Sequence, residues 1–287
     1  MLRRWLTRLA SIAPLFLSSA VMASTEAAEK SGPPQLPSLA KLLVHWLGPE
    51  YEWIETWVNV IYAGLTSLIF CFLALMVYRK RQLKNPGKLQ NAMEMLVEGM
   101  YNFIHSILGK DAKTYAPFLG TLFFYILMNN LWGVVPLGHS PSTSINITAS
   151  LAILVFLYAQ YTGVRRLGVV GYFDHLAGTP RGAIMWALVP LQFPMHIIGE
   201  IAKPFSLALR LFGNITGEDV LVAAFVGLGV TAMGMFGSTV AEHTWIGLPL
   251  NIPFILLGLL LSTIQALVFT LLSTIYILMM LPHEEHH

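Results

Sequence analysis

The chain has 287 residues, of which 55% are hydrophobic and only 11% are charged, roughly half the charged share of a soluble domain. This composition predicts a polytopic membrane protein, and a formal net charge of +2 is too small to indicate nucleic-acid binding. The single cysteine, Cys71, excludes a disulfide within the chain and a cysteine metal site. We expect it to pack as a small apolar residue.

The first 23 residues are typical of a secretory signal. A basic stretch with Arg3, Arg4 and Arg8 precedes a short apolar run over 9–22 and small residues up to Ala23, after which we expect cleavage. A retained apolar anchor or a mitochondrial presequence is the alternative, because the segment is rich in arginine and lacks acidic residues. A polar, proline-containing lead-in follows over 24–53.

Hydropathy predicts five membrane-spanning helices and one amphipathic helix. The expected spans cover 54–78, 115–137, 145–163, 185–236 and 248–281, and the amphipathic segment 85–112 is expected to lie at the interface or to re-enter the membrane. A Gly-rich loop is expected over 167–184. The fold class is therefore an all-α polytopic membrane protein that ends in a long, strongly tilted two-helix hairpin.

Basic residues set the predicted orientation. The loop 79–113 holds seven Lys and Arg residues and the loop 164–184 holds three, whereas 138–144 and 237–247 hold none. The first two loops should therefore be cytoplasmic. The mature N-terminus is then periplasmic and the C-terminal tail, 282–287, is cytoplasmic, in agreement with the signal segment.

A polar stripe runs along the expected helix 185–236. At 100° per residue, its strongly polar side chains from 192 to 218 fall within about 80° of one another, and Asp219 falls about 180° from the start of the stripe. The stripe is about 39 Å long, which exceeds the roughly 30 Å hydrocarbon core. Its members are Gln192, His196, Glu200, Lys203, Arg210, Asn214 and Glu218.

Arg210 is the member that most needs an explanation. It lies inside SLALRLFGN, cannot lose its proton, and at a bilayer centre costs roughly 3 kcal/mol. Glu218 is about 12 Å away along the helix axis, so we expect its counter-charge on another molecule. The alternative is that Glu200–Lys203 and Arg210–Glu218 are structural pairs.

The last apolar segment carries a second, weaker stripe. Its polar and small residues also fall within about 80° of one another, so the two stripes could face each other on neighbouring antiparallel helices. Its members are Asn251, Gly258, Ser262, Gln265, Ser273 and Tyr276.

These residues resemble a known family. SLALRLFGN, together with NNLWGVVPL, PSTSINITASLAIL and STIQALVFTLLSTIYI, is similar to the a subunit of the Fo sector of ATP synthase over nearly the whole mature chain. The resemblance implies a stationary subunit beside a rotating ring of c subunits, with b subunits of the peripheral stalk, the F1 sector and the lipid bilayer as further partners. It implies two proton half-channels, no cofactor and no catalytic residue of its own.

The resemblance also implies residue roles. Arg210 corresponds to the arginine that faces the ring carboxylate, Asn214 and Gln265 to polar positions beside it, and Glu218 to the acid of the periplasmic half-channel. His196 and Glu200, with Lys203, would lie toward the cytoplasmic half-channel of a bacterial inner-membrane complex. Some family members have a histidine where this chain has Gly258, and Asp219 is an additional acid, so either Glu218 or Asp219 could relay the ion.

Two other classes of function were weighed. A stand-alone ion channel or secondary transporter is supported only by the polar stripe, and the sequence has no matched halves of the kind inverted-repeat transporters show. A membrane-embedded hydrolase is disfavoured, since GxSxG is absent. The HExxH pattern occurs only in the tail HEEHH, where we expect His283, His286 and His287 to be solvated rather than to bind a metal. The coupling ion is expected to be the proton, with sodium as the alternative.

The expected organisation of the chain follows from these assignments. We expect 54–164 to hold the N-terminal membrane helices, 165–184 to be a cytoplasmic loop and 185–281 to be the ion-translocating hairpin.

Overall fold

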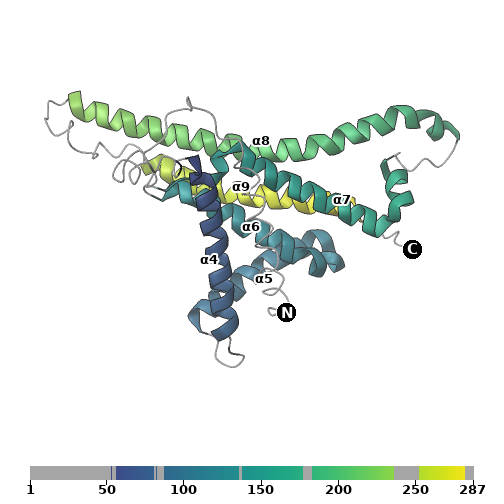
Figure 1. Cartoon of the computed structure of the whole chain (residues 1–287), viewed down its shortest axis with the longest axis horizontal. Coiled ribbons are helices and arrows are strands. Elements are labelled where there is room, and N and C mark those ends of the chain that lie inside the picture. Colours follow the sequence, from purple (N-terminus) through teal and green to yellow (C-terminus); the bar gives the residue numbers. More distant parts are fainter. Residues whose placement is uncertain are drawn as a thin grey trace.

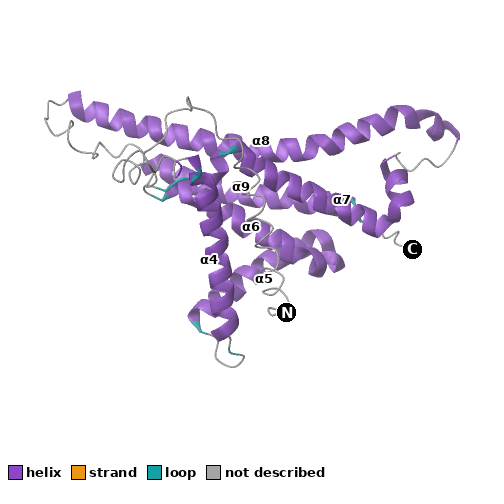
Figure 2. Cartoon of the chain, viewed as in Figure 1, coloured by secondary structure: helices purple, strands orange, loops and turns teal. Residues whose placement is uncertain are grey.

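The computed structural model describes residues 53, 56–80, 82, 87–135, 138–176, 183–235 and 252–281. Within these ranges every regular element is a helix (Figure 2), which agrees with the all-α class predicted from composition. The signal segment, the lead-in, the loop 237–247 and the C-terminal tail lie outside the described residues.

The described helices follow the expected apolar segments closely. They are α4 (Val58–Lys80), α5 (Lys88–Leu108), α6 (Ala112–Val134), α7 (Ile145–Leu176), α8 (Ala183–Met235) and α9 (Ile252–Met279). A 3-10 turn at Gly109–Asp111 joins α5 to α6, and a second one at Pro141–Thr143 precedes α7. Apolar side chains at most positions let these helices form where water is excluded, because each backbone hydrogen bond is made within the helix.

Four helical stretches of the described chain are long and apolar enough to cross a membrane. They are Val58–Arg79, Lys88–Val134, Ile145–Tyr172 and Ile252–Met279. The expected total of five spans and the tilted hairpin stay predictions, since length and composition do not give the direction of a helix in a bilayer.

Figure 1 shows how the helices are arranged. α7, α8 and α9 extend along the long axis of the molecule, and α4 crosses that direction. The most extensive packing joins α7 to α8 and α6 to α9, and α8 also contacts α9. α9 runs back along α8, and the stacked rings of Phe225 and Phe254, with centroids 3.9 Å apart, join the two helices.

One hydrophobic core lies among α5, α6, α7, α8 and α9. One face of α8 enters it, so that Leu207, Leu211 and Ile215 are almost fully buried. The core residues from the other helices include Ile104, Leu119, Leu122, Ile126, Leu151, Val155 and Phe269. The opposite face of α8 is exposed and apolar, as Phe205 and Leu209 show, which matters for the position of Arg210.

α8 is far longer than a membrane is thick. Its 53 residues extend about 80 Å, against a hydrocarbon core of roughly 30 Å. It contains Pro190, Pro194 and Pro204, and proline in a helix interior removes one backbone hydrogen bond and bends the helix. The N-terminal part of α8, which holds the first two prolines, curves away from the rest of the bundle (Figure 1).

Candidate functional site

Arg210 lies on the exposed face of α8, midway between its two acidic groups. Its neighbours Leu207, Ala208 and Leu211 are buried in the core, whereas Arg210 itself and Leu209 are exposed. Among the described residues no carboxylate forms an ion pair with Arg210. The structural pair Arg210–Glu218 is therefore not formed.

Asn214 and Gln265 join the two polar stripes one turn beyond Arg210. The Asn214 amide Nδ2 donates to Gln265 Oε1 over 2.7 Å, which links α8 to α9. Gln265 is only 3% exposed, and its own Nε2 has no hydrogen-bond partner. A buried amide with an unused donor can receive a further polar group without breaking the existing bond.

The Glu200 end of the stripe is closed by partners. Lys203 Nζ forms an ion pair with Glu200 Oε1, and Gln160 Nε2 of α7 donates to Glu200 Oε2 over 2.9 Å. The Lys203 ammonium also lies 5.5 Å from the centre of the Tyr276 ring on α9, a cation–π distance. Both carboxylate oxygens are thus occupied, and the alternative pairing Glu200–Lys203 is the one that the structure forms.

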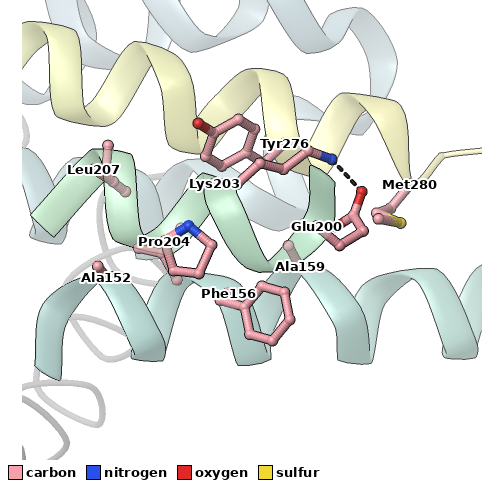
Figure 3. Close-up of a pocket in the computed structure, with 10 residues that line it drawn as sticks. Ala152, Phe156, Ala159, Glu200, Lys203, Pro204, Leu207, Tyr276 and Met280 are labelled. Atoms are coloured by element: carbon pink, nitrogen blue, oxygen red, sulfur yellow. Dashed lines mark hydrogen bonds and ion pairs between the residues drawn. The ribbon is translucent and has the colours of Figure 1, made fainter. Parts of the chain in front are cut away.

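A small cavity adjoins this cluster, between α7, α8 and α9. Figure 3 shows the Glu200–Lys203 pair beside Tyr276, with Pro204 and Phe156 along the wall. The remaining lining side chains are apolar, so the ion pair is the charged feature of the cavity. They are Ala152, Val155, Ala159, Leu207 and Met280.

Gly168 brings Tyr172 back to Gln160, the residue of α7 that holds Glu200. The Tyr172 hydroxyl donates to Gln160 Oε1 over 2.5 Å, although twelve residues of continuous helix would separate the two by about 18 Å. The chain turns at Gly168, whose φ of 73° and ψ of 168° are not helical, a conformation suited to glycine. The sequence predicts a Gly-rich loop from residue 167, whereas the structure has helix up to Leu176, broken only at this glycine.

The Glu218 end of the stripe is different, because two acids lie in one cavity. Glu218 and Asp219 both line a hollow between α6, α8 and α9. Glu218 lies over α9, where a Cβ added at Gly258 would overlap its carboxylate. Asp219 lies toward α6, with Oδ1 3.3 Å from the position of a Cβ at Gly133.

The two neighbouring acids therefore face different helices of the same cavity. The angular positions calculated from the sequence place Asp219 off the stripe. In the structure it still lies near Glu218, because the hollow is wide enough to contain both side chains, which leave α8 in different directions. Glu218 Oε2 is buried and has no hydrogen-bond partner. Among the described residues that line the hollow none is a lysine or arginine, but His139 is one of them, and its Nε2 is 2.8 Å from Asn59 Oδ1 of α4.

Several polar side chains near the stripe were not singled out from the sequence. Gln160 donates to Glu200, and Tyr172 donates to Gln160. Asn130 reaches α9 through its Nδ2, which donates to the Ser262 carbonyl over 3.4 Å. Ser142 Oγ donates to Asn130 Oδ1 over 2.7 Å. The sequence signal that could have identified these residues is their position in apolar segments, where a polar side chain needs a partner.

The remaining candidates are placed as follows. His196 is exposed and lies one turn before Glu200 on α8, while Ser262 and Ser273 are fully buried on α9. Within the described part of the chain no group of three His, Cys, Asp or Glu residues could hold a metal ion. The tail histidines His283, His286 and His287 lie outside the described residues.

Comparison with known proteins identifies relatives of this arrangement. The family model described as ATP synthase A chain matches residues 60–278. The chain is 43% identical over 258 residues to ATP synthase subunit a of Protochlamydia amoebophila (strain UWE25), an alignment that covers 88% of this chain and 91% of the relative. It is 38% identical over 214 residues to ATP synthase subunit a 3 of Pelobacter propionicus (strain DSM 2379 / NBRC 103807 / OttBd1), covering 74% and 83%. It is also 39% identical over 198 residues to ATP synthase subunit a of Oleidesulfovibrio alaskensis (strain ATCC BAA-1058 / DSM 17464 / G20), covering 69% and 75%.

Proposed function

Because the chain belongs to the ATP synthase A chain family, we propose that it is the stationary subunit that carries protons to and from a rotating c-ring. In this proposal it provides two half-channels, one open to each side of a bacterial inner membrane. The passage of protons through them drives the ring and is coupled to ATP synthesis by the rest of the complex. The chain itself performs no chemical step.

The exposed, unpaired position of Arg210 is the single observation that carries the proposal. A permanent cation on an apolar helix face is costly in lipid, and no carboxylate of the described chain neutralises it. A carboxylate on the ring is the complement. Opposite charge would favour its ionised form, so that a ring site loses its proton as it passes Arg210 and regains one only beyond it.

The hollow around Glu218 and Asp219 supports the periplasmic half-channel. Two acids, a histidine and a cavity of about 40 Å³ meet the requirements for bound water, which needs a polar and roomy site. The buried Oε2 of Glu218 has no partner and is therefore available to a water molecule or a proton. We propose that Glu218 is the relay and that Asp219 holds water beside it.

The Glu200 cluster supports the cytoplasmic half-channel. His196, Glu200 and Lys203 follow one another on the same side of α8, and Gln160 and Tyr172 extend the hydrogen-bonded groups to α7. Asn214 and Gln265 separate this cluster from the acids, and we propose that their bond fixes α9 beside Arg210. The b subunits and the F1 sector are further partners through the complex, with the mature N-terminus periplasmic and the C-terminus cytoplasmic.

The test is ATP-driven proton pumping by the complete complex reconstituted in vesicles. Arg210→Ala should abolish pumping, because the ring carboxylate then loses its counter-charge. ATP hydrolysis measured on F1 after its separation from the membrane sector should be unchanged. Arg79→Ala, which removes an exposed arginine at the end of α4, is the matched control and should pump normally. Normal pumping by Arg210→Ala would refute the proposal.

A second measurement separates the proposal from a stand-alone channel or transporter. The purified chain alone in vesicles should pass no protons above the level of empty vesicles, because neither half-channel crosses the membrane without the ring. Flux through the isolated chain would favour the independent channel.

Repeating the pumping assay on the complete complex with and without sodium distinguishes the two coupling ions, the proton and sodium.

A further inference from the structure

A polar hollow at the end of α7 belongs to neither half-channel. It lies between α6 and α7 and has a volume of about 300 Å³. Two arginines line it together with five hydroxyl-bearing side chains, so the lining is rich in donors and lacks a carboxylate. The lining residues are Thr114, Tyr115, Tyr158, Tyr161, Thr162, Arg165 and Arg166.

The charge of this hollow is positive. Arg166 donates from Nη2 to Asp111 over 2.7 Å and from Nε to the Tyr115 hydroxyl over 3.4 Å, which holds its guanidinium at the wall. Tyr115 is only 4% exposed, so this part of the site is built into the core. Arg165 is exposed and forms no ion pair with any described residue, and it therefore leaves one positive charge uncompensated.

The hollow continues into an apolar face of the same helix. Ile153, Leu157, Tyr161 and Val164 are 52%, 60%, 59% and 39% exposed, and at 100° per residue they fall within about 80° of one another. This face extends along the apolar part of α7 from residue 153 to residue 164. There it meets the hollow that Arg165 and Arg166 line. A cationic end with hydroxyl donors followed by an exposed apolar strip has the polarity of a phospholipid in one leaflet.

We propose that this hollow binds the phosphate headgroup of an anionic phospholipid, whose acyl chains lie along the exposed face of α7. Arg165 supplies the charge that the phosphate needs, and a phosphate accepts well from guanidinium and hydroxyl donors. Arg166 and Tyr115 form the wall. A helix of another subunit would cover the apolar strip but would leave Arg165 without an anion. The site goes beyond the proposed proton path, and lipid binding can be measured without proton flux.

The experiment uses the complete complex in phosphatidylcholine vesicles that contain a small fraction of phosphatidylglycerol with a photoreactive acyl chain. After irradiation, the labelled peptides are quantified by mass spectrometry. Labelling should concentrate on residues 153–164, and unlabelled phosphatidylglycerol should compete for it while millimolar inorganic phosphate should not. Arg165→Gln should lower this labelling about fivefold, the effect expected of one basic residue at an anionic surface.

Arg79→Gln is the matched control, since it removes an exposed arginine at another helix end and should leave labelling of α7 unchanged. The proposal fails if Arg165→Gln labels as the wild type does, or if the control falls equally. It also fails if photoreactive phosphatidylcholine labels α7 to the same extent. Effective competition by inorganic phosphate would assign the hollow to a free anion. A cross-link from a photoreactive residue at position 161 to a protein subunit would assign the strip to a protein partner.

Discussion

The two ends of the polar stripe on α8 are built in opposite ways. At one end Glu200 is paired with Lys203 and bonded to Gln160, so both of its oxygens have partners. At the other end Glu218 keeps a buried oxygen without a partner, beside a second acid. A carboxylate whose oxygens are satisfied holds its geometry, whereas one with an unused oxygen can take up water or a proton. The stripe therefore joins a fixed end to a receptive end, with Arg210 between them.

The largest effect should come from the point between the two ends. Arg210→Lys keeps the charge but replaces a planar guanidinium with a compact ammonium, which lacks the bidentate fork. If the arginine must hold a moving carboxylate at two points, proton pumping by the reconstituted complex should fall by at least tenfold. Wild-type pumping by Arg210→Lys would mean that a positive charge at position 210 is sufficient and that the bidentate geometry of the guanidinium is not required.

The receptive end should respond next most strongly. Glu218→Gln preserves shape but removes the group that can bind a proton, and pumping should slow about tenfold or more while the complex stays assembled on native gels. Asp219→Asn should slow it less, because Asp219 is proposed to hold only water. Glu98→Gln, an exposed acid on α5, is the control. If Asp219→Asn has the larger effect, the two roles are exchanged.

Gly258→Ala should disturb the receptive end sterically. The added Cβ would overlap the Glu218 carboxylate. Overpacking costs about 1–3 kcal/mol, and the loss should lie at the lower end because the carboxylate ends a flexible side chain that can move aside. Thermal dissociation of the complex should occur at lower temperature, and adding Glu218→Ala should restore it, since the double variant removes the overlap.

Gly99→Ala serves as the control for Gly258→Ala. Position 99 lies in α5 and an added Cβ there meets nothing within 4 Å, so stability should be unchanged or slightly higher. Equal losses in Gly258→Ala with and without Glu218 would show that the carboxylate does not occupy the space over α9.

The smallest effect is expected at the fixed end. Gln160→Leu removes the hydrogen bonds of Gln160 with Glu200 and Tyr172 but leaves the Lys203 ion pair. Stability should fall by about 0.6 kcal/mol for each bond, typical of polar contacts between membrane helices. Lys203→Met should cost more, because it leaves a carboxylate without its cation. Thermal dissociation of the complex measures both. If Gln160→Leu costs as much as Lys203→Met, the fixed end depends on α7 rather than on the ion pair.

Helix positions could be predicted well from the sequence because apolar length is a local property. The segment expected over 185–236 is α8, Ala183–Met235, and the segment expected over 248–281 contains α9, Ile252–Met279. The end of α7 was harder, since the glycines after residue 166 suggested a loop. A single non-helical residue, Gly168, turns the chain, and the residues after it return to helix because they can pack back on α7.

The site could be predicted only as far as one helix determines it. Angular positions on α8 place Arg210, Asn214 and Glu218 on one stripe and leave Asp219 off it. Such positions contain no information about neighbouring helices, so they could not show that both acids line one hollow. The hollow that receives both acids depends on Gly133 of α6 and Gly258 of α9. Gln160 was missed for the same reason, since its bond to Glu200 joins residues forty positions apart.

The spacing of the two acids along α8 has an electrical consequence. An ideal helix places Glu200 and Glu218 about 27 Å apart, roughly nine times the span of a single hydrogen bond, and Pro204 lies between them. Under the proposed function, this distance keeps the two half-channels apart, and the fixed positive charge of Arg210 between them would repel any proton that enters the gap. Current would then cross only on a carrier that moves past Arg210, and the proposed function therefore predicts that a membrane voltage is converted into motion instead of heat.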